Sequence, residues 1–293
     1  MNIYSCVDSK NISKIYVLFY SVFKNSKNFD KLKFYILTDQ YPEEKIPTFL
    51  KDKLKIGIIK FDNYWNKILN DFNKNFYQNS NWCKSDLNFA RFFIFEMFEE
   101  IDRAIYLDWD MIVQKDIFEL KEYYKKDDII VAKLENQDTL LKNIIKEQKK
   151  LKMESFNLIN KDFKINLMNQ SFNSGFYIIS KNHFELKRLS SFIRKLINYQ
   201  KNFSFFRFGT QVIMNLFPFN FEFIDFKWNT SNKDSSSYII HWSGSEKPWK
   251  SKDIIWTNYF NSLYNLKEVQ ENKKNNNLKI NKKFLTQKLF YKI

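Results

Sequence analysis

The stretch Arg103-Ala-Ile-Tyr-Leu-Asp-Trp-Asp-Met-Ile-Val113 sets two aspartates between apolar runs. Burying two unpaired carboxylates inside a strand is energetically expensive, so the pair needs a reason. Residues i and i+2 of a strand share a face, so Asp108 and Asp110 are expected to project together and Trp109 to face away. Convergent carboxylates at the end of a strand are typical of a site for a hard divalent cation. The alternative, a surface turn with two solvated acids, fits the apolar flanks poorly.

Short apolar segments alternate with helical patterns on either side of this stretch. Strands are predicted at residues 2–7, 32–37 and 54–61, with an amphipathic helix at 15–23 between the first two. Such β-α-β alternation indicates an α/β fold with a mostly parallel sheet and crossover helices. Residues 139–164 are expected to form a charged helical lid or insertion over the site. Further strands are expected at 104–107, 128–134, 172–180, 221–225 and 238–240, and further helices at 85–98, 183–199 and 208–217.

The 293 residues suffice for one large α/β domain or two small ones. There are 48 basic and 33 acidic residues, a net charge of +15, which suits nucleic acid, an anionic membrane or anionic substrates but also reflects A·T-rich codon usage. No stretch of about 18 residues is apolar and uncharged, so no transmembrane helix is expected. The first residues lack the basic and long apolar regions of a signal peptide. We therefore expect a cytoplasmic protein, with Cys6 as a buried thiol.

Several short motifs follow one another along the chain. They are Asp8 after the first strand, Arg91 in a helix, Leu107-Asp-Trp-Asp110, Phe172-Asn-Ser-Gly175, Gln211 and His241-Trp-Ser-Gly-Ser-Glu-Lys-Pro-Trp249. Over about residues 1–264 this ordered set resembles glycosyltransferase family 8, retaining enzymes of the GT-A fold. The resemblance implies a single nucleotide-binding sheet flanked by helices, and Mn²⁺ or Mg²⁺. It also implies transfer of galactose or glucose from a UDP-sugar to a surface glycan of the lipo-oligosaccharide type.

The resemblance makes Asp108, Asp110 and His241 the protein ligands of the metal, with diphosphate oxygens completing its shell. An imidazole among oxygen ligands suits Mn²⁺ better than Mg²⁺. A bound cation neutralises a diphosphate leaving group as a Lewis acid. Lys247 is expected to be a second cation for the diphosphate, the alternative being a solvated surface lysine. Gly244 would let the backbone approach the phosphates.

Other residues are expected to contact the donor. The resemblance makes Asp8 and Asn11 contacts to the uracil or ribose, the alternative for Asp8 being a helix N-cap. Arg91 lies on an apolar helix face, and a buried arginine needs an anionic partner, either the donor or an aspartate of the same domain. The family pattern adds Asn173 and Gly175 beside the donor sugar, Glu135 on its hydroxyls, and Lys84 and Ser85 as weaker contacts.

The resemblance places Gln211 at the reacting face of the anomeric carbon. An amide is a poor nucleophile, so we favour a same-face substitution that Gln211 supports electrostatically. The family commonly has Asp-Gln-Asp or Asp-Gln-Gly here, whereas this chain has Thr210-Gln211-Val212. A non-catalytic UDP-sugar-binding protein therefore remains an alternative. Two other functions are disfavoured, because a glycoside hydrolase needs carboxylates about 5 to 10 Å apart on opposite sides of a sugar, and no nucleic-acid-binding motif is recognisable.

From residue 265 the composition shifts to lysine and asparagine, and apolar residues return at near-helical spacing from Phe284 to Ile293. A basic amphipathic helix of this kind lies on an anionic membrane surface. We therefore predict a glycosyltransferase domain at 1–264 and a membrane-binding tail at 265–293, which would hold the protein on the inner face of the plasma membrane. The alternative is a disordered lysine-rich tail.

Overall fold

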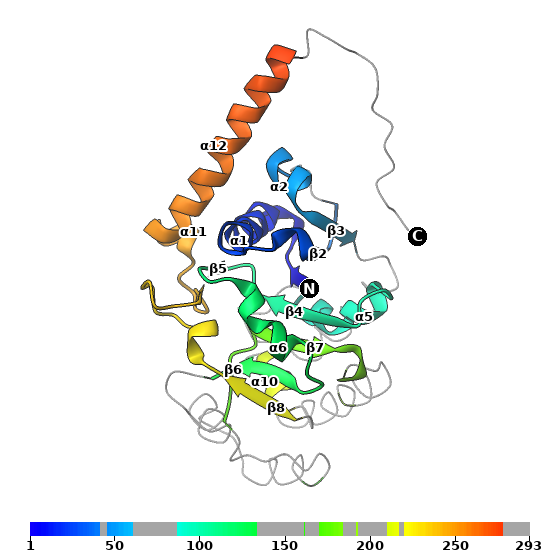
Figure 1. The fold of residues 1–293 in the computed structure, drawn as a ribbon. Coiled ribbons are helices and arrows are strands. Elements are labelled where there is room, and N and C mark those ends of the chain that lie inside the picture. The colour runs from blue at the N-terminus through cyan, green and yellow to red at the C-terminus, as the bar shows by residue number, and fades with distance from the viewer. Residues whose placement is uncertain are drawn as a thin grey trace.

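The computed structural model describes residues 1–41, 46–60, 87–133, 161, 170–183, 192, 210–216 and 220–277. Within them, seven strands form one sheet in the order β3-β2-β1-β4-β7-β6-β8 (Figure 1). Neighbours run parallel, except that β7 is antiparallel to β4 and β6. The mostly parallel sheet is confirmed. Its strands are β1 (Asn2–Cys6), β2 (Lys33–Thr38), β3 (Lys55–Lys60), β4 (Arg103–Leu107), β6 (Ile129–Ala132), β7 (Phe176–Ser180) and β8 (Phe221–Ile224).

Helices cover both faces of this sheet. Ile3 and Tyr4, neighbours in β1, point to opposite faces and join separate apolar clusters. One cluster contains α1 (Ile12–Asn25) and the start of α12 (Ile254–Asn277), and the other contains α4 (Leu87–Ala90), α5 (Ile94–Met97) and α10 (Thr210–Asn215). Burial on both faces explains why the strands read as continuous apolar runs.

The helix predicted at 85–98 is wrong as a continuous element. Its described part is three short pieces, with the 3₁₀ turn η3 (Arg91–Phe93) between α4 and α5. The Arg91 carbonyl accepts a hydrogen bond from the Tyr4 hydroxyl of β1 (3.0 Å). The Arg91 guanidinium is likewise bound by groups outside the helix. Tertiary hydrogen bonds therefore override the local helical preference at this position.

A second, two-stranded sheet positions the aspartate pair. β5 (Met111–Val113) runs antiparallel to β9 (Ile239–His241), with Met111 opposite His241. β4 ends at Leu107, which confirms the strand predicted at 104–107. Asp108 and Asp110 occupy a turn between β4 and β5, so the strand geometry expected to make the two side chains converge is wrong. The solvated-turn alternative also fails, because Asp110 is 5% exposed. The strand predicted at 172–180 starts only at Phe176, after a loop containing Asn173 and Gly175.

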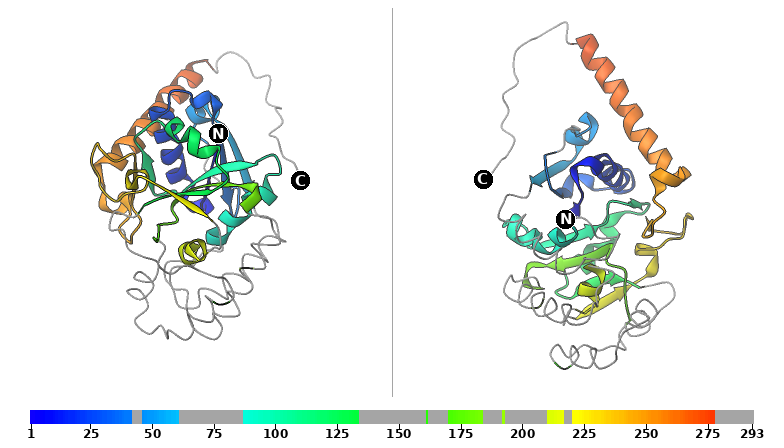
Figure 2. Two further views of the ribbon diagram at one scale, coloured as in Figure 1. Left: turned by 60° about the horizontal axis from the view of Figure 1, so that its bottom comes forward. Right: turned by 180° about the vertical axis from the view of Figure 1, so that it is seen from behind.

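The last described helix, α12, packs along α1 and α2 (Thr48–Lys53) and continues beyond them (Figure 2). The boundary proposed between residues 264 and 265 falls inside this helix, and the apolar repeat at 284–293 lies outside the described residues. In the described part of the chain, no helix has the length and apolar character needed to cross a membrane.

The predicted lid at 139–164 and helix at 183–199 lie almost wholly outside the described residues. The remaining helices are η1 (Ser9–Asn11), η2 (Phe29–Lys31), η4 (Ile117–Leu120), α6 (Lys121–Tyr124), η5 (Lys181–His183), η6 (Phe226–Trp228) and α11 (Pro248–Ser251).

Candidate metal centre and active-site pocket

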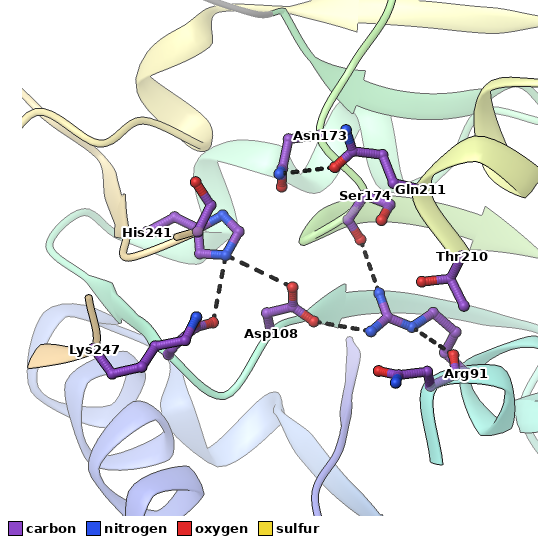
Figure 3. Close-up of a pocket in the computed structure, with 11 residues that line it drawn as sticks. Arg91, Asp108, Asn173, Ser174, Thr210, Gln211, His241 and Lys247 are labelled. Carbon is purple, nitrogen blue, oxygen red and sulfur yellow. Dashed lines mark hydrogen bonds and ion pairs between the residues drawn. The ribbon is translucent and has the colours of Figure 1, made fainter. Parts of the chain in front are cut away.

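A polar pocket opens where β4 ends and the loop before β7 begins (Figure 3). Several elements far apart in the sequence contribute to its wall, including η3, α10 and the segment after β9. Most of the predicted site residues meet here. The lining residues are Asn88, Arg91, Asp108, Asp110, Asn173, Ser174, Thr210, Gln211, His241, Ser243 and Lys247.

Three of these residues form a cluster suited to a metal ion. His241 Nε2 lies 3.6 Å from Asp108 Oδ2 and 3.4 Å from Asp110 Oδ1. One ligand atom from each residue lies within 4.8 Å of the others. Two oxygens and an imidazole nitrogen at this spacing fit a single divalent cation. The two aspartates converge as predicted, but the turn and the β5–β9 pairing produce the convergence.

Each carboxylate has one oxygen held by a cationic side chain and the other turned toward His241. Arg91 Nη2 lies 3.2 Å from Asp108 Oδ1, and the Tyr106 hydroxyl donates to the same oxygen at 2.5 Å. The Arg91 guanidinium also lies over the Tyr106 ring, 4.3 Å from its centroid. The second alternative for Arg91, an ion pair with an aspartate, is therefore confirmed, and that aspartate is the candidate ligand Asp108.

Lys247 has the same relation to Asp110. Its ammonium contacts Asp110 Oδ2 and donates to the Trp242 carbonyl at 2.8 Å. Burial by itself would raise the pKa of the Asp110 carboxyl, but the adjacent His241 and Lys247 lower this pKa to about 2. Asp110 is thus ionised over the whole physiological range although it is buried.

A chain of amide side chains connects His241 to Gln211. His241 Nδ1 lies 2.8 Å from Asn229 Oδ1, and Asn229 Nδ2 donates to the Asn173 carbonyl (3.1 Å) and to Asn173 Oδ1 (3.2 Å). Asn173 Nδ2 in turn donates to Gln211 Oε1 at 3.0 Å. No sequence motif marks Asn229, so its place in the site was not predicted. Tyr106 was not predicted either, although its i, i+2 spacing to Asp108 could have indicated it.

The model of "Glycosyl transferase family 8" matches residues 2–253. The chain belongs to glycosyl transferase family 8. No curated protein sequence matches it significantly.

Solved structures support the fold of this family 8 member. The galactosyltransferase LgtC in complex with donor and acceptor sugar analogues is 14% identical, with a TM-score of 0.62 over 89% of this chain and 96% of that chain. Mouse xyloside xylosyltransferase 1 is 16% identical, with a TM-score of 0.53 over 83% of this chain and 98% of that chain. GlyE of Streptococcus pneumoniae is 17% identical, with a TM-score of 0.54 over 90% of this chain and 63% of that chain. At these identities the likeness establishes a GT-A-like fold.

A glycine is needed at position 175 because the backbone there lies close to the His241 ring. A Cβ at Gly175 would lie 2.3 Å from His241 Cε1 and 2.9 Å from His241 Nδ1. Its carbonyl accepts from the Asp108 amide at 2.8 Å, so the glycine joins the loop before β7 to the aspartate turn. The predicted sugar contact of Gly175 stays a prediction. Gly244 differs, because a Cβ there would meet nothing within 4 Å.

Two residues predicted to contact uracil or ribose are absent from the described pocket wall. Both carboxylate oxygens of Asp8 accept from Asn11 Nδ2, at 2.8 and 2.9 Å. Asp8 occupies the N-cap position of η1, as the alternative predicted, but its side chain makes no capping hydrogen bond. Their contact with the donor stays a prediction, while Glu135, Lys84 and Ser85 lie outside the described residues.

Trp109 is not among the residues that line the described pocket, in line with the expectation that it faces away from Asp108 and Asp110. Its indole stacks on that of Trp249, with ring centroids 4.8 Å apart and planes at 17°. Trp249 follows Lys247 and Pro248 at the start of α11. The stack therefore ties the turn that carries the two aspartates to the segment that carries Lys247.

Burial raises the pKa of the Cys6 thiol to about 12, which confirms Cys6 as a buried, protonated thiol.

Proposed function

We propose that this chain is a metal-dependent retaining hexosyltransferase that moves galactose or glucose from a UDP-sugar to a surface glycan of the lipo-oligosaccharide type. The observation that carries the proposal is the arrangement of Asp108, Asp110 and His241, with one oxygen of each carboxylate directed at the imidazole. Family membership supports the class of donor, and the shared fold of the galactosyltransferase LgtC supports the hexose.

The three ligand atoms fit Mn²⁺ or Mg²⁺, and the imidazole favours Mn²⁺. When bound, the cation would offset the charge that builds up on the leaving diphosphate. Arg91 holds Asp108 in place and adds a buried positive charge to the pocket wall. The Lys247 side chain is 23% exposed. Its ammonium can therefore exchange its contact with Asp110 for a diphosphate oxygen.

Gln211 lies on the pocket wall away from the aspartates, with its Oε1 accepting from Asn173. We infer a same-face substitution in which the acceptor hydroxyl attacks the anomeric carbon on the side that the diphosphate leaves. The hydroxyl proton passes to the leaving phosphate oxygen, so the new glycosidic bond keeps the configuration of the donor. The amide dipole of Gln211 supports the positive charge that develops on the sugar.

A thermal-shift panel of UDP-sugars with and without Mn²⁺ tests this function. We expect one UDP-hexose to raise the melting temperature of the wild type only when Mn²⁺ is present, and Asp110→Asn to lose that increase. Asp127→Asn is the matched control, because Asp127 is an exposed acid paired with Arg103 and should keep the increase. The absence of metal-dependent stabilisation by every UDP-sugar would refute the proposal.

A non-catalytic UDP-sugar-binding protein is the second candidate. The observation that favours it is Thr210, a buried residue of the pocket wall where the family commonly has an aspartate. Release of UDP from a UDP-hexose in the presence of Mn²⁺ and acceptor distinguishes the two. Binding of UDP without any release of UDP from the sugar would establish the binding protein. The proposed location, on the cytoplasmic face of the membrane, is common to both candidates.

A further inference from the structure

The donor and acceptor roles in the chain of amides from His241 to Gln211 can be fixed without assuming any side-chain orientation. Asn229 presents one side-chain atom to the backbone carbonyl of Asn173. A carbonyl oxygen can only accept, so that atom must be the amide nitrogen of Asn229. The other atom, which faces His241 Nδ1 at 2.8 Å, must then be the oxygen. His241 Nδ1 therefore carries a proton and donates it.

A second backbone group fixes the other half of the chain. The Gly175 backbone N–H donates to one side-chain atom of Asn173 at 2.9 Å. An N–H can only donate, so this atom is Asn173 Oδ1, and Asn173 Nδ2 must face Gln211. Gln211 therefore accepts through Oε1. Every hydrogen bond from His241 to Gln211 is donated in the same direction.

We infer that Asn229 is a positioning residue of the site, an inference that rests on the proposed function only for the identity of the cation. Because Nδ1 of His241 donates to Asn229, the neutral ring has its lone pair on Nε2, the atom that faces Asp108 and Asp110. A lone pair directed at two carboxylates is repelled by them unless a proton or a metal cation lies between. Asn229 thus prepares His241 as a ligand, as groups behind a metal-bound histidine do elsewhere.

The same chain of amides also restricts the orientation of the Gln211 side-chain amide. Asn173 donates to the Gln211 oxygen and so fixes the orientation of the amide, while the second lone pair of this oxygen stays available to the developing positive charge. Asn229 and Asn173 therefore couple the orientation of the amide at the proposed reaction site to the tautomer of the proposed metal ligand.

Nitrogen NMR of the histidine rings tests the assignment directly on the full chain without metal. The chain has two histidines, His183 and His241, and His183→Gln identifies the signals of His241. We expect the neutral His241 ring in the wild type to carry its proton on Nδ1, the tautomer that free histidine disfavours. A neutral ring with its proton on Nε2 would overturn the inference, whether or not the protein is an enzyme.

Two variants of Asn229 extend the test to the cation. Asn229→Asp keeps an acceptor for Nδ1–H, whereas Asn229→Leu removes it at similar volume. We expect Asn229→Leu to lose the tautomer preference and to bind Mn²⁺, measured by electron paramagnetic resonance with UDP present, roughly tenfold more weakly. Asn229→Asp should keep the tautomer preference, because its carboxylate still accepts from His241 Nδ1–H, although it loses the donor to the Asn173 carbonyl. Equal Mn²⁺ affinity of wild type and Asn229→Leu would contradict the positioning role, while failure of the wild type to bind Mn²⁺ would refute the proposed function and leave the tautomer result standing.

Discussion

At the scale of single residues, the geometry of the site depends on the hydrogen bonds and ion pairs that each polar side-chain atom makes. One carboxylate oxygen of Asp108 contacts Arg91, and one of Asp110 contacts Lys247. The other oxygen of each carboxylate faces His241. The occupied oxygens fix the rotamers of the carboxylates, so the free oxygens are held in place before any ligand arrives. Such preorganisation reduces the cost of binding a cation.

Gly175→Ala tests the space around His241. A methyl group 2.3 Å from His241 Cε1 cannot be accommodated unless the ring moves, and moving the ring takes Nε2 away from the aspartates. We expect metal-dependent stabilisation by a UDP-sugar to be lost in the thermal-shift measurement. The matched control is Gly244→Ala, which adds the same methyl group to open space and should leave the melting temperature of the unliganded protein unchanged. Equal stabilisation of Gly175→Ala and wild type would show that the ring tolerates the displacement.

At the scale of secondary-structure elements, the positions of the strands are easier to predict from the sequence than the pairing between strands. The apolar runs around β1, β2 and β4 have the right positions, because a strand buried on both faces leaves a clear pattern. The β5–β9 pairing could not be predicted, since it joins two three-residue segments that lie far apart in the chain. The break at Arg91 was missed for a related reason, because its cause is a hydrogen bond from Tyr4 in β1.

The motifs predicted the site in the same uneven way. Arg91, Asp108, Asp110 and His241 were identified because charged residues next to apolar runs are conspicuous. Asn229 was missed, because its role depends on what its amide meets in space.

Glu96 in α5 gives a prediction on stability. Both of its carboxylate oxygens are buried without a hydrogen-bond partner, and burial raises the pKa of this carboxyl from 4.5 to about 8. Between these pH values the folded protein keeps a proton that the unfolded chain releases. The free energy of unfolding should therefore fall as pH rises from 4.5 to about 8.

Urea denaturation of Glu96→Gln at several pH values checks this expectation. The glutamine cannot ionise, so the variant should lose the downward slope and exceed the stability of the wild type at pH 8 and above. Glu99→Gln is the control, because Glu99 is exposed and its substitution should leave the slope unchanged. Parallel pH profiles for wild type and Glu96→Gln would rule out Glu96 as the source.

At the scale of the whole molecule, a GT-A-like domain continues directly into a long helix. α12 begins against α1 in the core and extends past residue 264 to Asn277. A helix that crosses the proposed boundary would transmit the orientation of the membrane-binding tail to the catalytic domain. The first part of the proposed tail, residues 265–277, therefore continues the helix that packs against the core.

Truncation after Asn277 tests the proposed tail without cutting α12. We expect the shortened chain to lose binding to vesicles containing anionic lipid, because it lacks the lysines and apolar residues at 278–293. Stabilisation by UDP-sugar and Mn²⁺ should persist, since the described pocket lies outside this segment. Cosedimentation with vesicles at low and high salt provides the measurement. Unchanged binding of the truncated chain would assign membrane association to another surface.

The stacked indoles of Trp109 and Trp249 have an optical consequence. Two aromatic chromophores 4.8 Å apart couple their electronic transitions, and coupled transitions produce a paired positive and negative band in ultraviolet circular dichroism. One chromophore lies on the turn between Asp108 and Asp110, and the other lies two residues after Lys247. The ring centroid of Trp249 also lies 5.8 Å from that of Trp256, so the part of the signal that Trp109→Phe removes records the mutual orientation of these two segments. Circular dichroism can therefore report, without an added label, on the geometry of the segments that carry the candidate metal ligands and Lys247.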